Sequence, residues 1–97
     1  MAARDNILDS RASVPEGVVY RAFEAETLLL NLATGTYHGI DPTGARMLEL
    51  LGETEGDVRL SIQRLASETG VETEDIADEL ADFCIELVDR GLLELAP

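Results

Sequence analysis

The chain has 97 residues, of which 45% are hydrophobic and 4% aromatic, so we expect one domain with a modest, mainly aliphatic core. Its 20 acidic and 7 basic residues give a net charge of −13, which opposes binding to nucleic acid or to an anionic membrane and favours a basic or neutral partner. A single cysteine excludes an internal disulfide, and the lack of a signal region and of a hydrophobic run of roughly 18 residues favours a soluble cytoplasmic protein.

The N-terminal segment, residues 1–16, is polar and mixed in composition, with Pro15 near its end. Terminal segments of this kind are often poorly ordered, so we expect a flexible arm. The remaining residues, 17–97, are expected to form a single domain.

Three segments have the composition of β-strands and predict an antiparallel meander. Val18–Phe23 is rich in β-branched and aromatic residues. Thr27–Leu32 is the most apolar run of the chain, which predicts that it lies in the centre of the sheet. Thr36–Ile40 follows as the third strand and should lie at an edge, with unpaired N–H and C=O groups pointing outward.

A two-residue turn at Thr34 and Gly35 is predicted between the second and third strands, because glycine readily adopts the positive φ that such turns require. Counting outward from this turn pairs Leu32 with Tyr37. On the same strand, His38 is interpreted as a half-exposed packing residue rather than as a catalytic base.

Start and stop signals predict three helices in the rest of the chain. Asp41 as N-cap and Pro42 in the first turn begin the first helix, which should end at Gly52. The second should run from about Asp57 to Thr69, and the third from Thr73 to Gly91. The sequence therefore predicts an α+β fold of the winged helix-turn-helix type, with a three-stranded antiparallel sheet followed by three helices.

The third predicted helix carries an apolar arc that is wider than one buried face requires. At 100° per residue the arc spans roughly half the circumference, whereas a one-sided surface helix needs about 100°. Either a partner or the chain's own ends, the N-terminal arm and the apolar tail at residues 92–95, must cover the second half of the arc. That half consists of small residues with two larger neighbours: Ala77, Ala81, Cys84, Ile85 and Val88.

No residue pattern supports catalysis. A nucleophilic cysteine needs a base nearby, and the only histidine, His38, lies in a different segment from Cys84. The turn at residues 34–36 lacks the glycine-rich run and the lysine of a phosphate-binding loop. We therefore expect no enzyme activity, no catalytic residue, no cofactor and no metal.

The open edge strand and the small-residue half of the third helix could together form a groove. An extended peptide can add to an edge strand through main-chain hydrogen bonds and place alternate side chains against a neighbouring helix. Gly39 has no side chain and would allow a close approach. The sequence thus favours a peptide-binding site over an active site.

The segment from Leu28 to Leu51, LLLNLATGTYHGIDPTGARMLELL, resembles the strand–turn–strand–helix segment of the PqqD-like family. In that family an aliphatic strand is followed by a polar residue, a Thr-Gly or Ser-Gly turn, an aromatic strand, an acidic or amide residue and a Gly-Ala pair. The ending ELVDRGLL, from Glu86 to Leu93, is similar to the usual ending of the family. The resemblance extends over about Val18 to Leu95.

This resemblance implies a small winged-helix-like peptide chaperone, a recognition element for ribosomally synthesised and post-translationally modified peptides (RiPPs). Such a protein binds the leader segment of a precursor peptide and catalyses no reaction. The leader would add to the third strand and lie against the third helix. Carried over to this sequence, the implied peptide-binding residues are Thr36, Tyr37, His38, Gly39 and Ile40 with the neighbouring Leu32, and on the helix Ala77, Ala81, Cys84, Ile85 and Val88.

The hairpin TGTYHGID and the ending GLL most resemble the discrete recognition proteins of lasso-peptide clusters, which present the precursor to a separate leader peptidase. A leader segment and a leader peptidase are therefore the implied partners. The pyrroloquinoline quinone branch of the family is the alternative. Two functions of other classes stay open here, a winged-helix DNA-binding protein, which the charge of −13 opposes, and an enzyme that uses Cys84.

Overall fold

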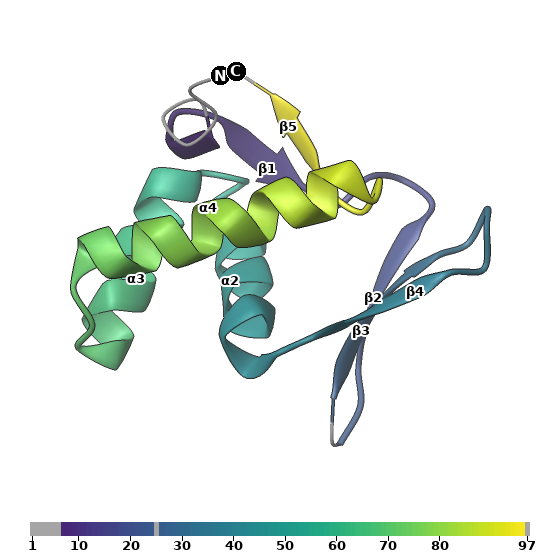
Figure 1. Cartoon of the computed structure of the whole chain (residues 1–97), viewed down its shortest axis with the longest axis horizontal. Coiled ribbons are helices and arrows are strands. Elements are labelled where there is room, and N and C mark those ends of the chain that lie inside the picture. The colour runs from purple at the N-terminus through teal and green to yellow at the C-terminus, as the bar shows by residue number, and fades with distance from the viewer. Residues whose placement is uncertain (1–6, 25, 97) are drawn as a thin grey trace.

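The computed structural model describes residues 7–24 and 26–96 (Figure 1). A three-stranded sheet projects from one side of the helices, and a small two-stranded sheet joins the beginning and the end of the described chain. The elements in chain order are β1 (Arg11–Ser13), β2 (Val18–Ala22), β3 (Thr27–Asn31), β4 (Tyr37–Ile40), α2 (Pro42–Glu53), α3 (Val58–Thr69), α4 (Thr73–Asp89) and β5 (Glu94–Ala96).

The three-stranded sheet confirms the predicted meander. β3 is its central strand and β4 lies at an edge, as the sequence indicated. The antiparallel register pairs Tyr20 with Leu29 and Leu29 with His38. Because Leu29 is fully buried, this row of side chains faces the helices, and the alternate residues of each strand face away from them.

The hairpin between β3 and β4 is longer than the predicted two-residue turn. Tyr37 pairs with Leu30 instead of Leu32. The physical reason is Asn31, whose Oδ1 accepts hydrogen bonds from two backbone N–H groups of the loop (2.9 and 3.2 Å) and so stabilises a wider turn. Gly35 has the predicted positive φ, 74°. Since the register differs by two residues, each side chain keeps its predicted face of the sheet.

The helices α2 and α3 begin where their capping residues predicted. Oδ1 of Asp41 accepts a hydrogen bond from Gly44 N–H (2.7 Å), and Oδ1 of Asp57 accepts one from Leu60 N–H (3.0 Å). Gly70 ends α3 with φ 75°. These local hydrogen bonds explain why the helix boundaries could be read from sequence.

Two predicted helix ends are wrong in detail. Gly52 does not end α2, because the chain turns only at Glu55 and Gly56, which have φ values of 58° and 88°. Gly56 is required there because an added Cβ would lie 2.8 Å from the carbonyl oxygen of Ala12 in β1. The N-cap of α4 is Glu72 rather than Thr73, and its side chain makes no capping hydrogen bond.

The segment expected to be a flexible arm contains a strand. β1 pairs with β5, and Ala12 N–H donates a hydrogen bond to Gly56 O (2.8 Å). Ile7 and Ala12 are buried, so residues 7–16 contribute to the core. The partner strand comes from the far end of the chain, which local composition does not reveal. The expectation for residues 1–6 lies outside the described residues.

The wide apolar arc of α4 is covered in part by the two ends of the chain. Ala81 and Cys84 are 2% and 0% exposed, and Cys84 shares one buried cluster with Ala12 of β1 and Leu92 of the tail. This is the alternative that the sequence left open. Over residues 7–24 and 26–96, no helix is both long and apolar enough to cross a membrane.

Candidate functional site

The outer edge of β4 presents the backbone groups of Tyr37 and Gly39. Asn31 N–H donates to Thr36 O (2.8 Å), so these two residues form a hydrogen-bonded pair at the end of the ladder. In an antiparallel ladder such pairs alternate, which directs the N–H and C=O groups of His38 toward β3 and those of Tyr37 and Gly39 away from it. Within the described chain β4 pairs only with β3. The edge can therefore accept another strand.

The hydrogen bonds of β2 support this assignment independently. Phe23 N–H donates to Glu26 O (2.7 Å), which makes these two residues a hydrogen-bonded pair. Counting along that ladder directs the backbone groups of Leu28 and Leu30 toward β2. The remaining groups of β3, including those of Leu29, are then directed toward β4, as the first count requires.

Phe83 lies on the side of α4 that is next to the end of β4. A Cβ added to Gly44 would lie 2.7 Å from Cε1 of Phe83 and 2.9 Å from Cγ2 of Ile40. The aromatic ring therefore packs on the bare backbone of α2 beside the last residue of β4. Glu79 and Glu86 lie one turn either side of Phe83 on the same stripe of the helix, and both are exposed. The residues predicted from the sequence for this site do not include Phe83, whose half-buried side chain also packs against the hydrophobic core.

The five helix residues of the predicted peptide site do not form one exposed surface beside the edge of β4. Ala81 and Cys84 are buried, and Ala77 is half-buried. Ile85 and Val88 are 39% and 38% exposed, but at 100° per residue they lie on the flank of α4 away from Phe83. The structure therefore has the open strand edge of the predicted groove. The side of α4 next to that edge carries Phe83 and charged residues instead of the predicted small residues.

The strand residues of the predicted site alternate in direction. His38 and Ile40 belong to the face that packs toward the helices and are half-buried and buried. Tyr37 and Gly39 belong to the other face, and Tyr37 is 70% exposed. Thr36 lies just before β4, where its Oγ1 hydrogen-bonds to Oγ1 of Thr34 (2.7 Å). Leu32, 61% exposed, lies in the hairpin loop rather than in β3.

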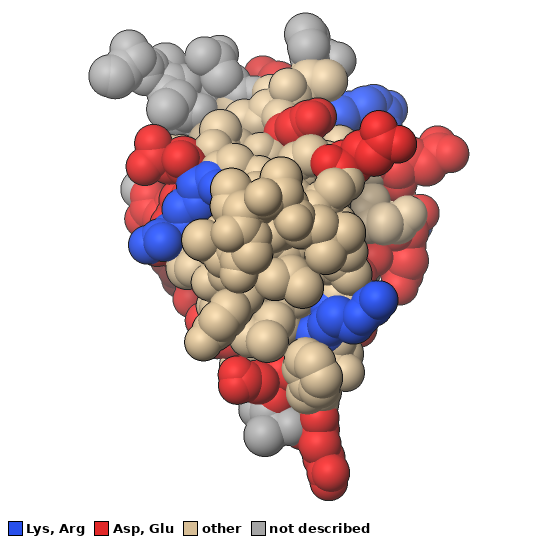
Figure 2. All heavy atoms as spheres, turned by 90° about the vertical axis from the view of Figure 1, so that its right-hand side faces the viewer, with Lys and Arg blue, Asp and Glu red and all other residues tan. Residues whose placement is uncertain are grey.

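The face of the sheet away from the helices is mostly apolar. Its rows join Val19, Leu30 and Tyr37, and beside them Arg21, Leu28 and Gly39. An antiparallel sheet with one solvated face usually carries polar residues there. Figure 2, which views the side of the molecule that bears the sheet, shows an uncharged surface bordered mainly by acidic side chains. Such a surface is typical of a binding site.

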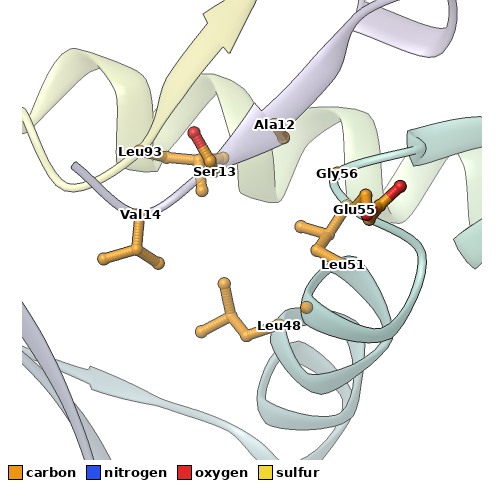
Figure 3. A pocket seen from close by; sticks show the side chains of 9 residues that line it. Ala12, Ser13, Val14, Leu48, Leu51, Glu55, Gly56 and Leu93 are labelled. Atoms are coloured by element: carbon orange, nitrogen blue, oxygen red, sulfur yellow. The ribbon is translucent and has the colours of Figure 1, made fainter.

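A further hollow lies between β1 and the C-terminal half of α2 (Figure 3). Its volume is about 400 Å³, and the side chains of Val14, Leu48 and Leu93 converge on it. Among the described residues that line it, Glu55 is the one that carries a charge, and none is a histidine or a cysteine. The hollow is mainly apolar, and the described lining offers neither a histidine nor a cysteine to act with Glu55 or Ser13, so it gives no support to a catalytic site.

The chemistry of Cys84 gives no support to the nucleophile hypothesis. Burial raises the pKa of its thiol to about 11, so the reactive thiolate is scarce at neutral pH. No cluster of three potential metal ligands occurs among residues 7–24 and 26–96. The open main-chain edge of β4 is therefore the feature that best indicates a function.

Comparison with known proteins identifies the family. The family model for coenzyme PQQ synthesis protein D (PqqD) matches residues 26–93. This chain belongs to the PqqD family. It is also similar to the solved structure described as TbiB1 in complex with the TbiA(beta) leader peptide, with 32% identity, a TM-score of 0.73, and coverage of 84% of this chain and 94% of that one. No curated protein matched this chain.

The PqqD match has a clear structural extent. It includes β3, β4 and the three helices, and it stops before the β1–β5 sheet is complete. The likeness to TbiB1 confirms the predicted α+β fold of the PqqD-family protein. Gly44 and Ala45 are the Gly-Ala pair of the sequence resemblance. Glycine is required at position 44 because the ring of Phe83 packs against its backbone.

Proposed function

We propose that this PqqD-family protein binds the leader segment of a ribosomally made precursor peptide, as a non-catalytic recognition element. The single observation that carries the proposal is the open edge of β4, where the backbone groups of Tyr37 and Gly39 point away from the sheet. The leader would add to this edge as a fourth strand. The likeness to TbiB1, a protein solved with a leader peptide, supports the same role.

The strand geometry gives the proposed leader two rows of contacts. Alternate leader side chains would lie toward the helices, beside His38 and Phe83, and away from them, beside Tyr37. Main-chain hydrogen bonds supply affinity that tolerates sequence variation, and the side-chain rows supply selectivity. The net charge of −13 favours a leader with basic residues and would attract it over a distance.

Hydrogen exchange with a leader peptide tests this proposal. The peptide is a synthetic leader from the precursor gene beside this one, titrated into the isotope-labelled protein. We expect micromolar or tighter binding, and the amides of Tyr37 and Gly39 should become protected from exchange. The amide of His38 is already bonded to β3 and should change little. Unchanged amide spectra at saturating peptide would exclude strand addition at β4.

We further propose a lasso-peptide pathway and a leader peptidase as the protein partner. The hairpin TGTYHGID and the ending GLL support the lasso branch. Reconstitution with the precursor, the peptidase and the macrolactam synthetase should give a cyclised product only when this protein is present. Tight binding of a pyrroloquinoline quinone precursor, with no binding of a lasso leader, would instead favour the alternative branch.

The apolar outer face of the sheet is the proposed contact surface for that peptidase. A leader strand on β4 would extend this face, so one partner could contact both the protein and its peptide. Val19→Lys places a charge on the outer face at β2, the strand edge opposite β4. We expect it to leave leader affinity unchanged and to abolish stimulated cleavage of the leader. Unimpaired cleavage would rule out this face as the contact surface.

A further inference from the structure

Gly39 is a glycine that the chain itself does not need. Its φ lies outside the left-handed region, and a Cβ added to it would meet no atom within 4 Å. Glycine inside a strand lowers stability because its backbone loses more freedom on folding and it has no side chain to pack. Gly44, by contrast, is required by contact with Phe83. Neither the backbone conformation nor the packing of the described chain therefore requires glycine at position 39.

The neighbours of Gly39 in the sheet show what its missing side chain leaves open. On the outer face, one row across the sheet runs Arg21, Leu28, Gly39, and the neighbouring row runs Val19, Leu30, Tyr37. The gap over Gly39 leaves Leu28 half-exposed behind it, with the exposed ring of Tyr37 in the next row. We call this missing side chain, with Leu28 behind it on the outer face, the notch at Gly39.

We infer that the notch at Gly39 is a side-chain subsite that selects a bulky apolar residue of the leader. This inference rests on the proposed strand addition at β4. In either strand direction, the leader residue opposite Gly39 directs its side chain to the outer face. A large apolar side chain there lies across the glycine and contacts Leu28, the arrangement by which aromatic residues compensate for glycines in neighbouring strands. A small or charged residue leaves Leu28 in water.

The subsite gives the leader a register as well as affinity. Main-chain hydrogen bonds alone allow an added strand to slip by two residues and keep the same faces. A single bulky side chain that fits only over Gly39 removes that freedom. The notch therefore fixes which leader residue lies opposite β4, and hence where the leader ends relative to the rest of the precursor.

A double-mutant cycle tests the subsite. Each leader position is replaced in turn by alanine, and binding is measured by titration calorimetry to the wild-type protein and to Gly39→Val. For the wild type we expect one outward-facing leader position at which alanine weakens binding about tenfold, since a large side chain loses its contact with Leu28. Gly39→Val should weaken the native leader by a similar factor and should be insensitive to alanine at that position.

Folding controls accompany the cycle. Valine has space at position 39 and suits a strand, so Gly39→Val should raise Tm by roughly 2–8 °C, and lost binding would not reflect unfolding. Arg21→Val changes the opposite edge of the same row and should leave the leader affinity unchanged.

Three results would separate the hypotheses. A wild-type protein that binds no leader contradicts the proposed function itself. Leader binding with equal sensitivity to alanine in the wild type and in Gly39→Val overturns the subsite alone. The subsite is also overturned if Gly39→Val weakens the binding of every leader variant by the same factor. That result would mean that glycine is needed for close approach of the leader backbone and does not select a side chain.

Discussion

The ring of Phe83 lies directly against the backbone of Gly44. A Cβ at position 44 would come within 2.7 Å of the ring atom Cε1. This contact fixes how closely α4 approaches the start of α2, and Ile40 at the end of β4 packs beside it. The end of β4, whose edge is the proposed leader-binding site, and the neighbouring helix α4 therefore both pack on Gly44, a residue that has no side chain.

Gly44→Ala should consequently lower the free energy of unfolding by about 1–3 kcal/mol, because the added methyl group displaces a packed ring. Gly52→Ala is the matched control in the same helix, where an added Cβ meets no atom within 4 Å. It should stabilise the protein by about 0.5–1 kcal/mol. Urea denaturation measures both values, and equal effects of the two variants would contradict the close contact.

Proline substitutions should distinguish the two edges of β4. Tyr37→Pro removes an N–H that points to the open edge, so it should leave the fold intact and weaken leader binding at least threefold. His38→Pro removes an N–H that is directed toward β3, and it should lower Tm. The opposite pattern, with Tyr37→Pro destabilising the fold, would mean that the assignment of outward groups is reversed.

Tryptophan substitutions on α4 should show which side of the helix faces the leader. Glu86→Trp adds bulk on the Phe83 side and should reduce leader affinity. Val88→Trp adds the same bulk on the other flank, at a residue 38% exposed, and should have no effect. Loss of binding only in Val88→Trp would mean that the leader contacts the flank of α4 that was predicted from the sequence. Ala81→Trp should instead unfold the protein, because Ala81 is buried.

The N-terminal strand can be tested with two neighbouring substitutions. Ala12→Glu introduces a charge at a position 1% exposed and should destabilise the protein by at least about 2 kcal/mol. Ser13 is exposed, so Ser13→Glu should change stability little. Thermal denaturation compares the two. If both variants melted like the wild type, the segment would be the loose arm that its composition suggested.

Cys84 should be inert to alkylation in the native protein. With its pKa raised to about 11 by burial, its thiolate fraction at pH 8 is on the order of one in a thousand, and the sulfur is inaccessible. Iodoacetamide should react quickly only after denaturation. Native reactivity equal to that of a free thiol would contradict this burial and revive the nucleophile hypothesis.

The sequence by itself determined the three strands of the meander and the three helices, in their order, but not the strands β1 and β5. The reason is that strands and helices begin and end through local interactions, such as the hydrogen bond between Asp41 and Gly44 N–H or the positive φ of Gly35. The high apolar content of Thr27–Leu32 also identified the central strand of the sheet. The turn length was missed because Asn31 side-chain bonds competed with the two-residue turn.

Only the tertiary structure decided what covers α4 and which side of it adjoins the site. β1 is ordered by β5, and Ala12 pairs with Leu95 across nearly the whole length of the chain. The position of Phe83 depends on Gly44, in another helix. Helical periodicity shows that an apolar surface must be covered, but it contains no information about which distant segment covers it, because that choice depends on packing between elements.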